Sequence, residues 1–487
     1  MTVRNLETRA AGQQPGLTPS IDVYRHTLLG DFDRRFLTNR AAWIAFAVLV
    51  VVLLAVSSIK PIRSIVQEDD SLWREGGTRH KTALGRWLPT AQALAEQGPQ
   101  ADPYGRGHWF PTPTLVLMAL VPLTKVGYTT AGVIWAALKI LGFLGVMFLL
   151  IREVGRGEFA VPLGVLIMTA LFGLRPVVGD LQHGNLNIFM MIWLTLAWVL
   201  YMRKRDFWAG LFVGLAIVTK VTPALLLVFF IYKRCWRICL GAGVGFLLFV
   251  LVIPGMYLGF LENIRLLCNW FEMLVAPYAL HGYATLEIPN QSLYGTLLRL
   301  LSNADVLSIQ AMPSLEAWDT GMEDMVRPDG TLGRLLRPAI GLMTVGTLAW
   351  LCRGRSASRR DPRAILEFAL VLLAMLLLSE RTWKHHATTL PIVYLGVWYA
   401  LTCLDWSPRF RGWFVGGLVV QLFLLLGTSE GIVGDDLAEL LLDAGVFCWG
   451  LLLCFLQTGV MLCMLRRRYT AEGREGILGP ADSRPSN

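Results

Sequence analysis

Five sets of polar residues interrupt an otherwise apolar sequence, and their side chains are of the kinds that bind phosphate, bind sugars or accept protons. An acidic triplet, Glu68–Asp70, follows the first apolar run. The stretches GDLQHGNLN (179–187) and SERTWKHH (379–386) each separate two apolar runs, and Lys220 interrupts another. The pair Asn-Gln at 290–291 lies in a long polar segment. These positions are the candidates for chemistry in the chain.

The basic residues among them suit an anionic ligand. They are Lys220, Arg381, Lys384, His385 and His386. Cationic side chains donate charge-assisted hydrogen bonds to phosphate, and basic residues at the outer end of a membrane span run against the usual bias of Lys and Arg toward the cytoplasm. A lipid phosphate is the natural partner. Buried salt bridges are the alternative, and for Lys220 so is an interfacial position of its ammonium group.

The acidic triplet supplies candidates for a general base. Carboxylates commonly accept the proton of a hydroxyl group as that group attacks an electrophile. Glu68, Asp69 and Asp70 lie just beyond the first apolar run. The shorter side chains of Asp69 and Asp70 are held more firmly than that of Glu68, so these two are favoured, and the choice between them stays open. A solvated acidic loop without a catalytic role is the alternative.

Neither a metal site nor a disulfide framework is predicted. The eight cysteines lie mostly in or beside apolar runs, and the two closest are four residues apart, which does not match the spacing of zinc ligands. No Asp-x-Asp motif occurs in the loops expected on the outer side. We therefore expect no metal and no other cofactor.

The elements that must position the candidate residues are apolar. The chain has 487 residues, of which 54% are hydrophobic and 16% are charged, whereas about a quarter are charged in ordinary soluble domains. A soluble fold of this size could not bury so much apolar surface, so a lipid bilayer must cover the rest. The net charge of +9 does not indicate a nucleic-acid partner, because the basic residues form short runs between apolar segments.

Runs that can cross a bilayer, which takes about 20 residues, recur along the chain. They lie near 41–59, 129–151, 160–176, 185–202, 237–258, 336–352, 364–379, 386–403, 411–427 and 444–465. The run 206–233 is broken at Lys220 and Pro223, which predicts two short tilted spans or a re-entrant hairpin. Residues 111–126 contain three prolines and predict a segment that enters the membrane without crossing it.

The basic runs predict which end of the bundle faces the cytoplasm. If residues 111–126 do not cross, these runs all fall on one side. Residues 1–40 and the basic tail 466–487 are then cytoplasmic and flank a membrane domain over 41–465. The first apolar run acts as a signal anchor, because about forty polar residues precede it.

Two long loops then face the opposite, non-cytoplasmic side. They cover about residues 60–110 and 260–335. Each contains an amphipathic segment, 87–94 in the first and 293–301 in the second, which is typical of helices lying at a membrane interface. All the candidate residues share this side, so we expect the chemistry there.

At four places the sequence resembles glycosyltransferase family 87, whose members have the GT-C architecture and use polyprenyl-phosphate sugars. The similar stretches are QHGNLN (182–187), AGLFVGLAIVTKVTP (209–223), NQSLYGTLLRLL (290–301) and SERTWKHH (379–386). Their order, spacing and common side make the combination more specific than any one stretch. The resemblance extends over about residues 41–465 and implies a GT-C-like bundle of about 10–13 transmembrane helices with interfacial helices in the two long loops.

The sequence departs from the family at one position. The family usually has an acidic residue in the first outer loop, shortly before an aromatic and Ala-rich helix. The corresponding helix here resembles RWLPTAQALAEQG (86–98), and no Asp directly starts it. The acid would have to come from further upstream, from Glu68, Asp69 or Asp70. An inactive member of the family is the alternative.

The resemblance implies an inverting transfer of a monosaccharide, a mannose-like hexose or a pentose, from a polyprenyl phosphate to a hydroxyl of a glycan or glycolipid. The cations would stabilise the charge that grows on the leaving phosphate. The implied substrate-binding residues are Gln182, His183, Asn185, Asn187, Asn290, Gln291 and Trp383. The expected location is the bacterial cytoplasmic membrane, with the site on its non-cytoplasmic face. A transporter or flippase of lipid-linked sugars is the rival class.

Overall fold

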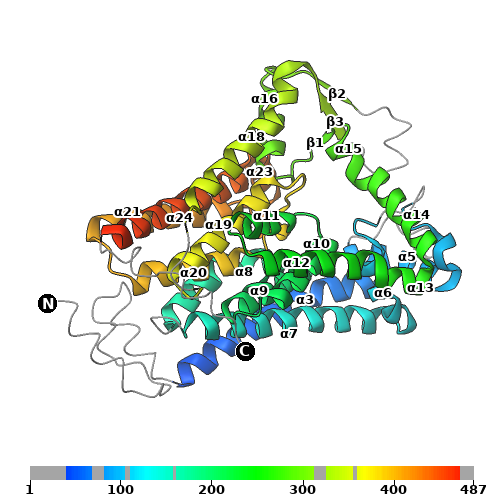
Figure 1. Cartoon of the computed structure of the whole chain (residues 1–487), viewed down its shortest axis with the longest axis horizontal. Helices are drawn as coiled ribbons and strands as arrows, with labels where there is room; N and C mark the ends of the chain where they lie inside the picture. The colour runs from blue at the N-terminus through cyan, green and yellow to red at the C-terminus, as the bar shows by residue number, and fades with distance from the viewer. Residues whose placement is uncertain are drawn as a thin grey trace.

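Helices make up nearly all of the regular structure, as the apolar runs predicted (Figure 1). The computed structural model describes residues 40–67, 82–104, 110–156, 161–311, 325–354 and 359–471. Within these ranges the helices are interrupted by a single small sheet. The chain is therefore an all-α polytopic membrane protein, as predicted.

The helices of the first half follow one another through short connections. They are α3 (Arg40–Gln67), α5 (Ala83–Gln97), the 3₁₀ turn η2 (Gly98–Ala101), α6 (Thr114–Leu120), the 3₁₀ turn η3 (Val121–Lys125), α7 (Tyr128–Val154), α8 (Leu163–His183), α9 (Asn187–Met202), α10 (Asp206–Thr219) and α11 (Ala224–Tyr232). The predicted break of the run 206–233 is confirmed, because α10 ends at Thr219 and α11 begins after Pro223.

The middle of the chain combines helices with the sheet. Its elements are α12 (Trp236–Leu247), the π-helical turn η4 (Leu248–Val252), α13 (Ile253–Leu258), α14 (Phe260–Trp270), the π-helical turn η5 (Phe271–Val275), α15 (Ala276–Ala279), β1 (Ala284–Thr285), α16 (Leu293–Asn303), β2 (Ile309–Ala311) and β3 (Met325–Pro328). The strands form an antiparallel sheet in the order β1-β3-β2, with Ala284 opposite Val326 and Gln310 opposite Arg327.

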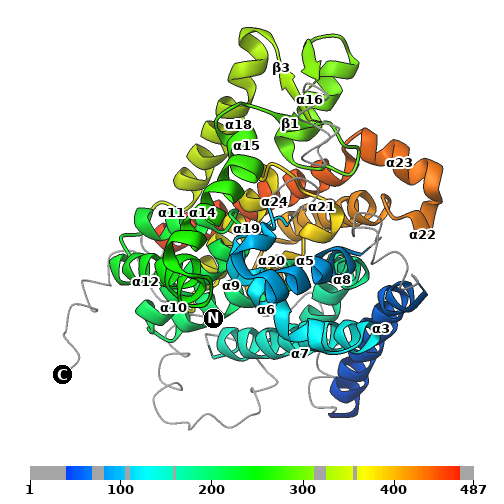
Figure 2. The same cartoon turned by 90° about the vertical axis from the view of Figure 1, so that its right-hand side faces the viewer.

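The last third is again helical. It comprises α18 (Gly330–Leu351), α19 (Pro362–Leu378), the 3₁₀ turn η6 (Lys384–His386), α20 (Leu390–Cys403), α21 (Pro408–Leu426), α22 (Glu430–Val433), α23 (Asp435–Asp443) and α24 (Val446–Ala471). The three-stranded sheet, α16 and one end of α18 form one extremity of the molecule in both views (Figures 1 and 2).

Six of the described helices are long and apolar enough to cross a membrane. They cover Arg40–Ile59, Tyr128–Val154, Leu163–His183, Trp236–Leu258, Pro408–Leu426 and Val446–Arg468. Four further apolar helices are shorter, at Thr114–Lys125, Asn187–Met202, Asp206–Thr219 and Leu390–Cys403. The expected 10–13 crossings need shorter helices to cross as well, so that number stays a prediction.

The core lies along α19 and α20, whose residues are buried on every side. A helix that is apolar all round needs such an environment. The outermost span is α3, which packs on α7 and α8 and exposes Ile44 and Leu49 to the surroundings (Figure 2). Only 11% of its most apolar window is buried in the protein, which fits a helix covered by lipid.

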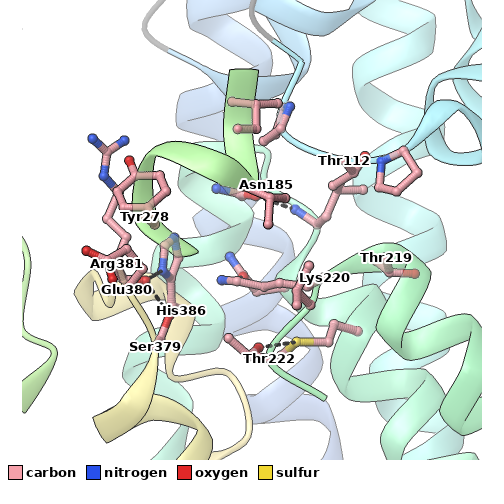
Figure 3. Close-up of a pocket in the computed structure, with 18 of the residues that line it drawn as sticks. Thr112, Asn185, Thr219, Lys220, Thr222, Tyr278, Ser379, Glu380, Arg381 and His386 are labelled. Carbon is pink, nitrogen blue, oxygen red and sulfur yellow. Dashed lines mark hydrogen bonds between the residues drawn. The ribbon is translucent and has the colours of Figure 1, made fainter. Parts of the chain in front are cut away.

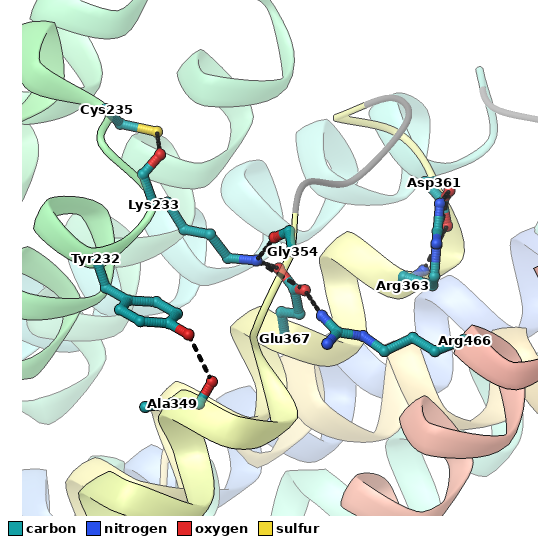
Figure 4. Close-up of polar contacts among 9 residues, drawn as sticks. All are labelled: Tyr232, Lys233, Cys235, Ala349, Gly354, Asp361, Arg363, Glu367 and Arg466. Atoms are coloured by element: carbon teal, nitrogen blue, oxygen red, sulfur yellow. Dashed lines mark hydrogen bonds and ion pairs between the residues drawn. The ribbon is translucent and has the colours of Figure 1, made fainter. Parts of the chain in front are cut away.

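The basic runs gather around the start of α19. Lys233 and Arg466 both contact the buried carboxylate of Glu367, at 2.9 and 2.6 Å (Figure 4). The buried carboxylate of Glu153 likewise forms ion pairs with three arginines, Arg156, Arg203 and Arg360. A single end of the bundle therefore collects these runs, as the positive-inside distribution predicts. Its orientation toward the cytoplasm stays a prediction.

The amphipathic segments of the two long loops are helical, as predicted, but both pack into the protein. On α5 the side chains of Trp87 and Leu88 are each only 2% exposed, and Leu298 of α16 is fully buried. An exposed apolar face occurs instead on α14, where Leu261 is 83% exposed. The sequence had not singled out this helix or the sheet.

Candidate functional site

A cavity of about 540 Å³ lies where the two long loops meet the ends of α8, α10 and α19 (Figure 3). Four of its cations come from separate parts of the chain, namely Arg86, Lys220, Arg337 and Arg381. His386 and Glu380 also line it. The rest of the wall includes apolar side chains, among them Met190, Val221, Trp270, Leu274 and Leu378. The cavity can therefore hold a ligand with an anionic head and an apolar body.

Lys220 reaches the cavity because α10 stops one residue before it. Its backbone is extended, with φ −159° and ψ 139°, and Pro223 prevents the helix from continuing smoothly into α11. The ammonium group donates a hydrogen bond to Asn187 Oδ1 at 2.9 Å. The Lys-x-x-Pro pattern thus places a cation at a break between two helices.

Asn187 is itself held by the buried carboxylate of Asp180. Its side-chain amide donates to Asp180 Oδ1 at 2.9 Å, and its backbone N–H donates to the same oxygen at 3.3 Å. The Lys139 ammonium pairs with Asp180 Oδ2 at 2.6 Å, and both side chains are fully buried. A buried polar chain of Lys139, Asp180 and Asn187 therefore sets the position of the Lys220 ammonium.

Gly184 closes the turn between α8 and α9 that brings these groups together. Its φ of 65° is left-handed, a conformation that favours glycine. A Cβ atom here would lie 3.3 Å from the Cβ of Leu84 and 3.4 Å from its backbone nitrogen. A glycine at this turn therefore also lets α5 approach the site.

The SERTWKHH turn is fastened by Asn290 and Gln291. The Asn290 amide donates to the Glu380 carbonyl at 3.1 Å, and its Oδ1 accepts from the Thr382 N–H at 3.0 Å. The Gln291 N–H donates to the Thr382 carbonyl at 2.6 Å. Both side chains are fully buried and do not line the cavity. In this structure they position the turn.

Two ion pairs orient the polar side chains of this turn. Arg381 lies 2.8 Å from Glu287, and Glu380 lies 2.8 Å from Arg337. Both arginines and Glu380 line the cavity, whereas Glu287 does not. Each arginine is thus held at the cavity wall by an ion pair with a carboxylate.

His386 and Trp383 stack with parallel rings on the same wall. The imidazole Nδ1 lies 3.2 Å from the Trp383 N–H and 3.1 Å from the Arg381 carbonyl, so the backbone occupies this nitrogen and Nε2 is the one left for a ligand. Burial, reinforced by the nearby Lys220 charge, lowers the pKa of His386 well below its ordinary value. The ring is therefore neutral at pH 7.

Not all predicted phosphate-binding residues reach this wall. Lys220, Arg381 and His386 line the cavity, but Lys384 and His385 do not. The Lys384 ammonium donates to the Thr428 carbonyl at 2.8 Å and lies 3.4 Å from Glu430. His385 stacks on His183, with 4.2 Å between ring centres.

The predicted sugar-binding residues divide in the same way. Asn185, Asn187 and Trp383 line the cavity, whereas Gln182 and His183 are exposed outside it. Asn185 links the two groups, because its amide nitrogen lies 3.3 Å from His385 Nε2. The ligand roles of all these residues stay predictions.

The predicted bases Glu68, Asp69 and Asp70 lie outside the described residues. The helix that follows them, α5, begins at Ala83 with Thr82 as its N-cap; the Thr82 hydroxyl accepts from the Gly85 N–H at 3.2 Å. At this helix start, where the sequence has no Asp, a threonine therefore provides the N-cap. Among the described residues that line the cavity, Glu380 is the sole carboxylate.

No metal-binding cluster is found among the described residues: no three His, Cys, Asp or Glu side chains lie close enough together to hold an ion. The expectation that no cofactor takes part stays a prediction.

Sequence reasoning missed several residues of the site. Lys139 could have been found as a lone cation inside the apolar run 129–151, a position that usually marks a buried partner or a function. Arg337 and Arg86 carried no such signal, since each lies near the end of an ordinary helix. Their place at the cavity depends on contacts between distant segments.

Comparison with known proteins gives a consistent picture. The model of glycosyltransferase family 87 matches residues 110–380, more than half of the chain. The chain is 25% identical over 222 residues to the polyprenol-phosphate-mannose-dependent alpha-(1-2)-phosphatidylinositol mannoside mannosyltransferase of Mycolicibacterium smegmatis, which covers 45% of this chain and 43% of that protein. It is 24% identical over 330 residues to the corresponding pentamannoside mannosyltransferase of Mycobacterium tuberculosis, covering 65% of each. The chain thus spans less than two thirds of the length of these curated relatives.

Proposed function

Because the chain belongs to glycosyltransferase family 87, we propose that it transfers a monosaccharide from a polyprenyl-phosphate donor to a hydroxyl group of a glycan or glycolipid. The sugar is a mannose-like hexose or a pentose, and mannose is favoured because both curated relatives are described as polyprenol-phosphate-mannose-dependent mannosyltransferases. A single displacement inverts the configuration at the anomeric carbon.

The convergence of Lys220, Arg381 and His386 on one cavity is the observation that carries this proposal. The donor is a phosphodiester with one negative charge, and it leaves as a monoester with more charge. Cations fixed in a partly apolar site stabilise charge that grows during the reaction. When Nδ1 of the neutral His386 ring accepts from the Trp383 N–H, Nε2 carries the proton and can donate a hydrogen bond to the phosphate.

The apolar part of the wall suits the isoprenoid tail of the donor. Met190, Val221 and Leu378 lie beside the cationic residues, and Trp270 and Leu274 come from the long outer loop. A hydrocarbon chain gains stability from contact with such side chains. A sugar phosphate without a lipid would leave this surface uncovered.

The proposed site faces away from the cytoplasm. The turn that carries Arg381 and His386 follows the C-terminal end of α19, whereas the clusters around Glu153 and Glu367 lie near its N-terminal end. Lys and Arg accumulate on the cytoplasmic side of membrane proteins. In a bacterial cell the protein would lie in the cytoplasmic membrane with the cavity at its outer surface.

A carboxylate must accept the proton of the attacking hydroxyl group. The resemblance to the family directs attention to the acidic triplet of the first outer loop. If one of its residues is the base, Asp69→Asn or Asp70→Asn removes the basic oxygen and abolishes turnover while conserving shape. Full turnover by both variants in a membrane transfer assay would exclude both residues.

The proposed function is tested by incubating membranes that contain the protein with radiolabelled polyprenyl-phosphate mannose and, separately, with a labelled polyprenyl-phosphate pentose. We expect the label to move from the donor to a new glycolipid or glycan in one of the two cases. If the labelled donor instead crosses the membrane of sealed vesicles intact, the protein is a flippase.

A further inference from the structure

Glu380 stands out because it is an acidic residue within a cationic wall. Among the described residues that line the cavity, it is the sole carboxylate, and its side chain keeps a quarter of its surface exposed. It belongs to the stretch SERTWKHH, where the residue pattern alone indicated no role for it. Lys220, Arg381 and His386, the proposed phosphate ligands, line the same cavity (Figure 3).

The carboxylate of Glu380 is held in place by Arg337. The guanidinium Nη2 lies 3.0 Å from Oε1 and 2.8 Å from Oε2. Arg337 is in turn fixed by the carbonyl oxygens of Tyr278 and Tyr283, to which it donates, and by the ring of Tyr294, 4.5 Å below its guanidinium carbon. An oriented carboxylate at the edge of a cavity can receive a proton from a bound hydroxyl group.

The electrostatic surroundings leave Glu380 basic. Burial raises the pKa of its carboxyl group to about 7, although the nearby charges of Arg337 and Arg381 oppose the increase. The other titratable groups around it are Glu287, which pairs with Arg381, and the phenols of Tyr278 and Tyr294. A base with a pKa near the working pH is well matched to general base catalysis.

The first outer loop supplies the second observation. The helix before which the family usually has its acid begins here with Thr82, and Thr82 already caps that helix with its hydroxyl group. One turn further on, Arg86 and Trp87 of the same helix line the cavity. The start of this helix, which in the family usually follows an acidic residue closely, is thus capped here by a threonine.

We propose that Glu380 is the general base of this chain, taking the proton of the acceptor hydroxyl group during sugar transfer. The acceptor oxygen forms a bond to the anomeric carbon as the bond from that carbon to the phosphate oxygen breaks. The bonding electrons leave with the polyprenyl phosphate, and the proton moves to the Glu380 carboxylate, which later releases it to water. This assignment rests on the proposed function and replaces the acidic triplet as the base.

A purely structural role for Glu380 makes different predictions. The turn is held through the backbone carbonyl of Glu380, which accepts from Asn290, rather than through its side chain. Glu380→Gln retains this carbonyl and an oxygen that can accept from Arg337, but it removes the basic group. Glu262→Gln is a matched control, because Glu262 is half exposed on α14 and pairs with Arg265 at 2.9 Å, away from the cavity.

The test measures transfer by the purified, reconstituted protein as a function of pH. We expect Glu380→Gln to lower kcat by about 10²–10⁴-fold, the usual contribution of a general base, with donor KM nearly unchanged. Glu262→Gln should match the wild type. Because the deprotonated form is the active one, wild-type kcat/KM should fall as the pH decreases through about 7. This acid limb should vanish in Glu380→Gln.

The conservative variant Glu380→Asp covers the case in which Glu380→Gln does not fold, since it keeps a carboxylate and should retain an acid limb with a lower rate. Turnover by Glu380→Gln within tenfold of the wild type, an acid limb that persists in it, or a flat profile in Glu380→Asp would each overturn the assignment. Any of these leaves the proposed function intact while the wild type is active. A wild type that transfers no sugar from either donor would overturn both.

Discussion

The ammonium of Lys220 is positioned through Asn187 by two residues that do not line the cavity. Lys139 and Asp180 form a fully buried ion pair, and Asp180 holds the Asn187 amide that accepts from Lys220. Burying a charge is costly unless a partner compensates it. The pair therefore explains why a lysine is tolerated in the apolar run of α7.

Removing one member of this pair should destabilise the protein more than removing both charges. Lys139→Met leaves the Asp180 carboxylate buried without its cation, which typically costs about 3–5 kcal/mol. The double variant Lys139→Met/Asp180→Asn removes both charges and should recover part of that loss. Thermal unfolding of the purified variants in detergent measures the difference. Equal thermal unfolding midpoints for the single and double variants would contradict the ion pair between Lys139 and Asp180.

Lys220 and Lys384 should differ in their effect on donor binding. Lys220 lines the cavity, whereas Lys384 is directed at Thr428 and Glu430. Loss of a hydrogen bond to a charged group costs about 1.5–3 kcal/mol, so Lys220→Met should weaken binding of a polyprenyl-phosphate sugar by roughly 10–100-fold. Lys384→Met should weaken it less. Titration of the purified variants with the donor measures the two affinities. If Lys384→Met loses as much affinity as Lys220→Met or more, Lys384 binds the phosphate as the sequence predicted.

At the level of single residues, the sequence identified polar groups that have no reason to lie in apolar surroundings. Lys220, Arg381 and His386 were found in this way, and the cavity contains all three. Arg337 and Glu380 were not found, because their meeting depends on tertiary structure. Arg337 lies 43 positions before Glu380 in the chain. Its guanidinium group is oriented by the carbonyl oxygens of Tyr283 and Tyr278, which lie 54 and 59 positions before Arg337.

Close contact between α10 and α12 fixes the helix that ends just before Lys220, a proposed phosphate ligand. Gly210 and Gly214 on α10 face Gly241 and Gly245 on α12, a pair of small-xxx-small motifs that lets two backbones approach. A Cβ on Gly241 would lie 2.2 Å from the Phe207 carbonyl oxygen. Backbone cannot move aside as a flexible side chain can, so the two helices would have to separate.

Gly241→Val should therefore destabilise the protein, by about 1–3 kcal/mol as for other overpacked sites. It should also reduce transfer, because displacement of α10 shifts Lys220. Gly243→Val is the matched control on the same helix, since no atom lies within 4 Å of a Cβ at Gly243. Expression level, thermal midpoint and transfer rate of the two variants are compared. Indistinguishable variants would show that the contact between α10 and α12 is not critical.

Hydropathy predicted the apolar elements well but not their polar ends. The break at Lys220 and the helix at 293–301 were correct. The run predicted at 160–176 continues as helix to His183, because polar residues such as Asp180 are accommodated by partners that hydropathy cannot show. The small sheet escaped prediction because its strands have at most four residues and pair across long stretches of chain.

On the scale of the whole molecule, the basic end near Glu153 and Glu367 and the cavity lie toward opposite ends of α19. This separation is what an enzyme needs if it receives a lipid-linked donor on one side of a membrane while anchoring its basic end on the other. The sequence predicted the arrangement from charge bias alone. The side of the membrane on which each end lies is open to direct measurement.

Single cysteines introduced into a variant lacking the eight native ones test this topology. Glu75→Cys and Gln310→Cys, in the two long loops, should react with a membrane-impermeant thiol reagent added to intact cells. Ser358→Cys, in the basic connection before α19, should react only after the membrane is opened. Labelling of Ser358→Cys in intact cells would show that the predicted membrane topology is wrong.

The central claim is that this cavity transfers sugar from a polyprenyl phosphate, and one measurement addresses it most directly. Purified protein in liposomes is supplied with polyprenyl-phosphate mannose or, separately, with a polyprenyl-phosphate pentose, together with a lipid extract as acceptor, and the products are identified by mass spectrometry. With one of the two donors, the account predicts one new glycosylated product for each molecule of polyprenyl phosphate released, and loss of both in Lys220→Met. If both donors stay intact, or if the donor is consumed equally fast by Lys220→Met, the claim is contradicted.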